Sequence, residues 1–207
     1  MTKLGLPTAT LFTKPLPKKA VFDTFKPSTA DRKVFDEQIS RMAIVAEISP
    51  QTLAIAASEE VLAVYVVHVA LKVPDCDKNN IAMLSKLIDQ RMLFVLQHGD
   101  NARLAAYRTG KVLVSDSKPQ GDWVLPLTGL DLEAIWENAI AQIGGIDLSD
   151  GKDLDTTIIE SDRRDKVAKK IEALEKKAMS EKQPRRKWEL AEEIKKLKTE
   201  LEDTKNG

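Results

Sequence analysis

The 207-residue chain contains a single cysteine, Cys76, and only two histidines, His68 and His98. One cysteine excludes an internal disulfide, and this stock of ligands is too small for a four-ligand structural zinc site. The longest nearly apolar run, Val61 to Leu71, has 11 residues, fewer than the ~20 that a helix needs to cross a bilayer. The sequence therefore predicts a cytoplasmic protein without a membrane span.

An excess of charge of either sign is also missing. Lysine plus arginine and aspartate plus glutamate number 32 each, so the formal net charge is +0. No field of the whole protein would attract nucleic acid or a membrane surface, and a charged partner must be recognised by a local patch. The first ten residues have neither the apolar stretch of a secretory signal nor the composition of a transit peptide, so we expect no targeting segment.

Prolines interrupt the start of the chain, and they predict an extended N-terminal arm over residues 1–27. Ser28 followed by Asp31 is typical of a helix start. Apolar residues then recur at helical spacing at Phe35, Ile39, Met42 and Ala46. This pattern predicts a first helix over 30–47, which Pro50 terminates.

The middle of the chain combines signals for strands and for helices. β-branched residues fill 61–73 on both faces, which favours a central strand. The segment His-Gly-Asp-Asn at 98–101 separates two short apolar runs and predicts a β-hairpin. The apolar pattern of 132–143 is amphipathic and ends at two glycines. We therefore expect an α+β domain over 28–148, with a mixed or antiparallel sheet flanked by about three helices.

The last quarter of the chain differs in composition. Residues 149–160 are acidic and polar, which suits a linker. From Ser161 onward there is one proline, Pro184, and no glycine before the last residue. Two sets of apolar residues repeat there with heptad-like spacing: Val167, Ile171, Leu174, Ala178, and Leu190, Ile194, Leu197, Leu201. Residues 161–207 are thus predicted to form an antiparallel helical hairpin, a short coiled coil that could also pair with a second copy as a homodimer.

Residues that could carry catalysis or bind a metal do not form a known pattern. Cys76 stands between Asp75 and Asp77, whose charges oppose a reactive thiolate. These residues and the two histidines do not have the spacing of a standard metal site, and no phosphate-binding loop or nucleophile elbow occurs. The sequence assigns no catalytic residue, metal or cofactor and favours a non-enzymatic role. The alternative is a cryptic metal-dependent nuclease or other hydrolase whose acids converge only in the fold.

The predicted turn of the hairpin gathers cations next to a tryptophan. The candidate contact residues are Lys182, Arg185, Arg186, Lys187 and Trp188. Two interpretations of this tip remain open: it binds a protein partner, or it contacts the phosphates of a nucleic acid.

Three segments carry a resemblance to a known family. They read LTGLDLEAIWEN at 127–138, IEALEKK at 171–177 and EKQPRRKWELAEEIKKL at 181–197. With them, most of the chain resembles an uncharacterised bacterial family known as a domain of unknown function, DUF4391, which has no established activity. The resemblance implies a genomic context near helicases and DNA methyltransferases of restriction or antiphage islands. The resemblance implies an accessory or adaptor protein of such a defence system, with a helicase or a methyltransferase as its partner.

Overall fold

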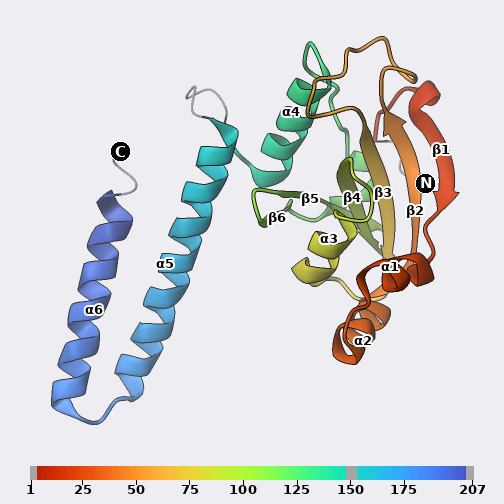
Figure 1. Ribbon diagram of the computed structural model, residues 1–207. Coiled ribbons are helices and arrows are strands. Elements are labelled where there is room, and N and C mark those ends of the chain that lie inside the picture. The colour runs from red at the N-terminus through yellow and green to blue at the C-terminus, as the bar shows by residue number, and fades with distance from the viewer. Residues whose placement is uncertain (1–3, 148–152, 204–207) are drawn as a thin grey trace. The chain divides into compact units, whose positions relative to one another are not determined.

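The computed structural model describes residues 4–147 and 153–203 (Figure 1). The chain divides into two compact units, residues 1–150 and 151–207. The first unit contains a β-sheet and four of the described α-helices, and the second contains two long α-helices. The expectation of a chain that mixes α and β structure and ends in helices is therefore confirmed.

The first unit is built on a seven-stranded sheet with the order β1-β2-β3-β4-β5-β6, and β7 pairs with β5 beside β6. β3 and β4 are parallel, and the other neighbouring strands are antiparallel. The sheet is thus mixed, and it is larger than we expected. The strands are β1 (Leu11–Pro15), β2 (Ile39–Ile48), β3 (Val64–Leu71), β4 (Arg91–His98), β5 (Asn101–Arg108), β6 (Lys111–Val114) and β7 (Lys118–Pro119).

Helices cover both faces of this sheet. Val21 and Phe35, from the first two helices, share a buried cluster with Val112 and other residues of one sheet face. Leu113 is next to Val112 and therefore points to the opposite face, where it lies close to Gly144 at the end of the fourth helix. Within its described residues the first unit has one helix more than the expected three. The helices are α1 (Lys18–Phe25), α2 (Thr29–Gln38), α3 (Lys78–Leu84) and α4 (Leu132–Gly144).

The predicted helix over 30–47 is wrong beyond Gln38, where β2 begins. Its start is correct, because the Ser28 hydroxyl accepts a hydrogen bond from the backbone N–H of Asp31 at 3.2 Å. The second half also has apolar residues at every other position, which is the spacing of a strand. The residues with this spacing are all buried, and they are Met42, Ile44, Ala46 and Ile48.

The structure also differs from the extended arm expected over 1–27. Residues 1–3 lie outside the described part of the chain, and the segment after them contains β1 and α1. Pro15 ends β1, which is the edge strand next to β2. Pro17 is the N-cap of α1. Proline is compatible with an edge strand and with a helix start, so these prolines delimit elements instead of preventing them.

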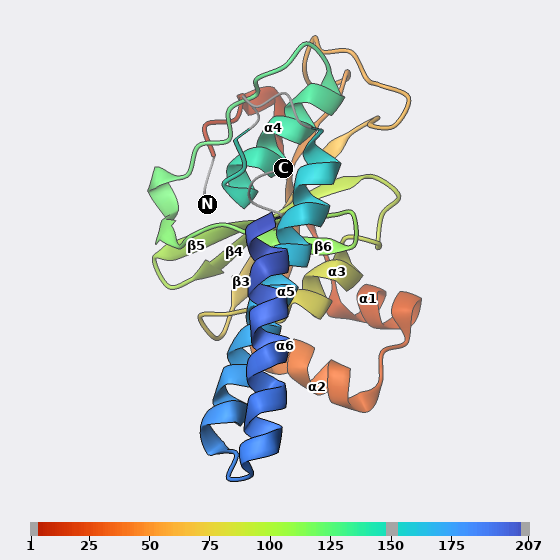
Figure 2. The same cartoon turned by 90° about the vertical axis from the view of Figure 1, so that its left-hand side faces the viewer.

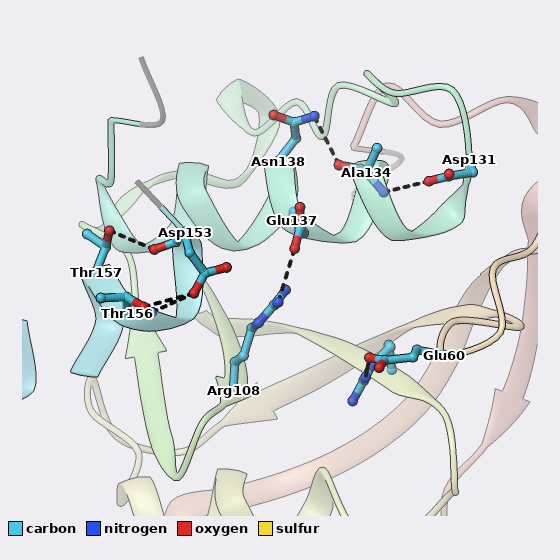
Figure 3. Close-up of polar contacts among 10 residues, drawn as sticks. Glu60, Arg108, Asp131, Ala134, Glu137, Asn138, Asp153, Thr156 and Thr157 are labelled. Atoms are coloured by element: carbon cyan, nitrogen blue, oxygen red, sulfur yellow. Dashed lines mark hydrogen bonds and ion pairs between the residues drawn. The ribbon is translucent and has the colours of Figure 1, made fainter. Parts of the chain in front are cut away.

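The second unit begins earlier than the sequence suggested. Of the predicted linker at 149–160, residues 149–152 lie outside the described residues, and the part from Leu154 belongs to α5 (Leu154–Ser180). The side chain of Asp153 caps this helix by accepting a hydrogen bond from the N–H of Thr156 at 2.9 Å (Figure 3). Acidic residues in this position also favour the helix dipole. The acids that suggested a linker are therefore signals of a helix start.

α5 and α6 (Pro184–Asp203) lie side by side as an antiparallel hairpin (Figures 1 and 2). Two of the ion pairs between the helices have the order of an antiparallel pair, since Arg163 early in α5 meets Glu200 late in α6 and Lys170 meets Glu193 nearer the turn. The pairs between the helices are Arg163–Glu200, Lys170–Glu193 and Glu175–Lys198. All eight residues of the predicted apolar seam are buried or half-buried. None of the helices in the described ranges is long and apolar enough to span a membrane.

Candidate partner-binding site

The turn of the hairpin is short and held by backbone hydrogen bonds. The N–H of Glu181 donates to the carbonyl of Lys177 at 3.0 Å and so closes α5. The N–H of Gln183 donates to the Glu181 carboxylate at 2.9 Å. Pro184 then occupies the first position of α6, where its fixed φ suits a helix start. The residues of the tip are therefore presented on a defined turn.

The structure does not bring the predicted contact residues onto one face. Successive residues of a helix differ in direction by about 100°, so four consecutive side chains in α6 point to four sides. Arg185 and Trp188 are three residues apart and share the side that faces away from α5. All five predicted residues are exposed, namely Lys182, Arg185, Arg186, Lys187 and Trp188.

Arg186 instead lies on the side of α6 that meets α5. It lines a hollow of about 290 Å³ whose other residues are Lys177, Glu181, Glu189, Leu190 and Glu193. The hydrogen bond from the Gln183 backbone lowers the pKa of Glu181, and the charges of Arg186 and Lys177 act in the same direction. Arg186 thus lies beside carboxylates of the hairpin, and Arg185 on the other side of α6 forms an ion pair with Glu189 at 3.3 Å.

Trp188 is the most distinctive residue of the tip. It lies two residues before Leu190, a residue of the seam, so its side chain points about 200° away from the seam. Its exposed fraction is 65%, and that of Met179 in the last turn of α5 is 83%. A large apolar side chain that the hairpin does not bury is a candidate for burial by a partner.

The single cysteine is placed as a protonated thiol and not as a nucleophile. Cys76 is half-buried before α3, and this burial raises its pKa to about 12, with Asp77 acting in the same direction. A thiol with such a pKa carries almost no thiolate at neutral pH. Within the two described ranges, no three His, Cys, Asp or Glu residues lie close enough to hold a metal ion.

His68 lies in β3 and contacts the side chain of Gln97 in β4. The ring Nε2 is 2.6 Å from Oε1 of Gln97, whose Nε2 in turn donates to the carbonyl of Gly99 at 3.0 Å. That second bond orients the amide, so Oε1 of Gln97 accepts a hydrogen bond from the Nε2–H of the His68 ring. Burial lowers the pKa of His68 below 6.5; the hydrogen bond to Gln97 opposes this shift, and the charge of Arg41 adds to it.

This lowered pKa predicts a loss of stability in mild acid. Below about pH 6.5 His68 binds a proton more readily in the unfolded chain than in the folded chain. Protonation therefore favours the unfolded state, and the free energy of unfolding falls as the pH falls. We expect the decrease between about pH 7.5 and about pH 5.5 to be smaller in His68→Gln, which does not titrate. Urea unfolding at both pH values measures the decrease in each protein. Equal decreases in the wild type and in His68→Gln would contradict the lowered pKa of His68.

The segment 127–138, one of the three that carry the family resemblance, fixes α4 to the sheet (Figure 3). The Asp131 carboxylate caps α4 by accepting from the N–H of Ala134 at 2.8 Å. The Asn138 side chain donates to the carbonyl of Thr128 at 2.9 Å and holds the preceding loop. Glu137 pairs with Arg108 of β5 at 3.1 Å. The polar residues of this segment therefore have structural roles.

Sequence reasoning missed a cleft at the amino ends of β3 and β4. Its volume is about 540 Å³, and its lining includes Glu60, Ser85, Lys86, Arg91, Tyr107 and Trp136. Lys86 Nζ lies 5.6 Å from the centre of the Tyr107 ring, and Arg91 is 3.7 Å from Glu60, which Figure 3 labels. The lining comes from four segments that are far apart in the chain, so no short motif could have indicated it.

Comparison with known protein families gives a match over residues 4–201 to the family described as Domain of unknown function (DUF4391). No curated protein and no solved structure matches the chain. The match covers nearly the whole chain and confirms the resemblance that the three segments indicated. The chain therefore belongs to the DUF4391 family of domains of unknown function.

Proposed function

We propose that this chain is a non-enzymatic accessory protein of a bacterial DNA restriction or antiphage defence system, and that the tip of its hairpin binds a protein partner. The observation that carries the proposal is the 65% exposure of Trp188 on the outer side of α6. A tryptophan offers a large apolar area for burial and is enriched among the residues that dominate binding energy at interfaces.

The charges around Trp188 indicate the surface that would receive it. The segment 181–189 contains four cations and two carboxylates, so the tip is locally basic although the whole chain is neutral. A complementary partner has an apolar pocket with an acidic rim. The partner that we propose, as the family resemblance implied, is a helicase or a DNA methyltransferase.

Two other uses of the same tip compete with this proposal. An exposed ring beside cations can also stack on a base of single-stranded nucleic acid. The cations of α6, however, point to several sides of the helix and do not form one track along a phosphate backbone, which favours a protein rim. Pairing of two hairpins into a homodimer is the third use.

The experiment compares the tagged wild-type chain with Trp188→Ala, recovered from the native host with and without nuclease treatment. We expect a helicase or a methyltransferase to be recovered with the wild type. Once that partner is purified, Trp188→Ala should weaken binding by about 10-fold or more, since a buried tryptophan anchor is typically worth over 1 kcal/mol.

Lys195→Ala provides the matched control. Lys195 is exposed on α6, seven residues from Trp188 and two turns farther from the tip, so its replacement should leave the affinity unchanged. Circular dichroism of both variants verifies that the helices remain. Unchanged affinity in Trp188→Ala would refute the proposal. Recovery that depends on intact DNA would support nucleic-acid contact instead, and a dimer that dissociates in Trp188→Ala would support self-association.

A further inference from the structure

Polar side chains gather on one face of the β4–β5 hairpin, next to its turn. In the register of the two strands His98 is opposite Asn101, and Leu96 is opposite Arg103. Directly opposed residues share a face, and so do residues two apart in one strand, so these four side chains lie on the same side of the sheet. Leu96 belongs to the buried cluster beneath α1, α2 and α3, which identifies that side.

Two loops complete a small cavity over these residues. The segment after β3 contributes Pro74, and the segment after β6 contributes Ser117. The cavity has a volume of about 100 Å³ and is lined by Pro74, Leu96, His98, Asn101, Arg103 and Ser117 among others. This volume equals that of roughly three water molecules, which is enough for one tetrahedral oxyanion.

Arg103 is held in place at the wall of this cavity. Its Nη1 donates to Oδ1 of Asp75 at 2.6 Å, and the exposed fractions of the two side chains are 37% and 78%. A guanidinium has five N–H donors, and this bond uses one of them. Asp75 therefore orients the guanidinium, and the remaining N–H groups of a guanidinium are of the kind that bind a further oxyanion.

We propose that this cavity binds a phosphate group, either as free phosphate or as part of a mononucleotide. Guanidinium, amide and hydroxyl groups are hydrogen-bond donors suited to a ligand that has only acceptors and a negative charge. The cavity lies after β3 and at the end of β4, the parallel pair of the sheet, and the carboxyl ends of parallel strands are where open α/β sheets bind ligands. The proposal is independent of the hairpin and of its partner.

The test is a titration of the ¹⁵N-labelled full chain with sodium phosphate, with sodium chloride adjusted to keep the ionic strength constant. We expect saturable shifts of the backbone amide signals of residues 98–103 and 115–117, with a Kd on the order of 1 mM because the site is exposed to water. Arg103→Gln should weaken binding by about 10-fold or more, since it removes a charge-assisted hydrogen bond.

Asn101→Asp is the second variant, and it separates binding from folding. It keeps the size of the side chain but adds a negative charge at the cavity, so it should abolish binding even if Arg103→Gln disturbs the Asp75 loop. Arg91→Gln is the matched control, because Arg91 is 44% exposed, also contacts a carboxylate and lies at the other end of β4. It should bind phosphate as the wild type does.

A parallel titration with adenosine 5′-monophosphate distinguishes the two sources of the phosphate group. Binding at the same amides that is about 10-fold tighter than that of phosphate identifies a mononucleotide, and equal affinity identifies the free anion. The proposal is overturned if phosphate at about 50 mM gives no saturable shifts at these amides. It is also overturned if binding is the same in Asn101→Asp as in the wild type.

Discussion

Replacement of Phe94 by alanine is expected to lower the free energy of unfolding of the first unit by about 3–5 kcal/mol. Phe94 is fully buried at the centre of β4, where it is paired with Val67 of β3 and Ala105 of β5. It belongs to the cluster that joins the sheet to α1, α2 and α3. Alanine would leave a cavity in that cluster, because strands fixed on both sides restrict how far the neighbours can relax.

The measurement is urea unfolding followed by tryptophan fluorescence in a Trp188→Phe background. This background leaves Trp123 and Trp136, which are buried in the first unit and report on its unfolding alone. Phe12→Ala is the matched control, since Phe12 is 38% exposed in the edge strand β1 and should cost only about 1 kcal/mol. Similar losses in both variants would show that the cluster around Phe94 does not form the core.

Replacement of Gly129 by alanine is expected to cost about 2–4 kcal/mol. Gly129 has a φ of 147°, a conformation that residues with a side chain rarely adopt. A Cβ added there would lie 2.7 Å from the Cβ of Ala134 and 2.8 Å from the backbone nitrogen of Ile135. Strain and clash therefore combine at the start of α4, where the Asp131 cap also lies.

Two other glycines separate these contributions. Gly110 has a φ of 79° and an added Cβ there meets nothing within 4 Å, so Gly110→Ala should show the strain alone, about 1–2 kcal/mol. An added Cβ at Gly121 also meets nothing within 4 Å, and its φ is not positive, so Gly121→Ala should change stability by about 0.5 kcal/mol or less. The order Gly129, Gly110, Gly121 is the expected result, and an equal cost at Gly129 and Gly110 would contradict the clash.

Elements with signals inside their own segment could be predicted from the sequence. α4 runs from Leu132 to Gly144, with Asp131 as N-cap and Gly145 as a C-cap at φ 61°, close to the predicted helix. The β4–β5 hairpin likewise turns at Gly99, which has a positive φ of 58°. Caps, turns and apolar spacing act over a few residues, so the chain shows them without knowledge of its partners.

Elements that depend on distant neighbours could not be predicted in this way. Ile44 of β2 is paired with Lys14 on one side and Val67 on the other. Its segment has apolar spacing that fits a helix and a strand about equally well, and only these two neighbours decide between them. The same holds for the proposed phosphate cavity, because Pro74 and Ser117 reach it from loops outside the β4–β5 hairpin.

For the hairpin tip, the sequence by itself determined which residues gather there: cations and Trp188 around a turn at Pro184. Tertiary structure decided how each is presented. Pairing of α6 with α5 turns Arg186 toward the carboxylates of the hairpin and leaves Trp188 exposed on the opposite side. The physical reason is that composition and local spacing are properties of one segment, whereas the direction and burial of a side chain depend on the segment packed against it.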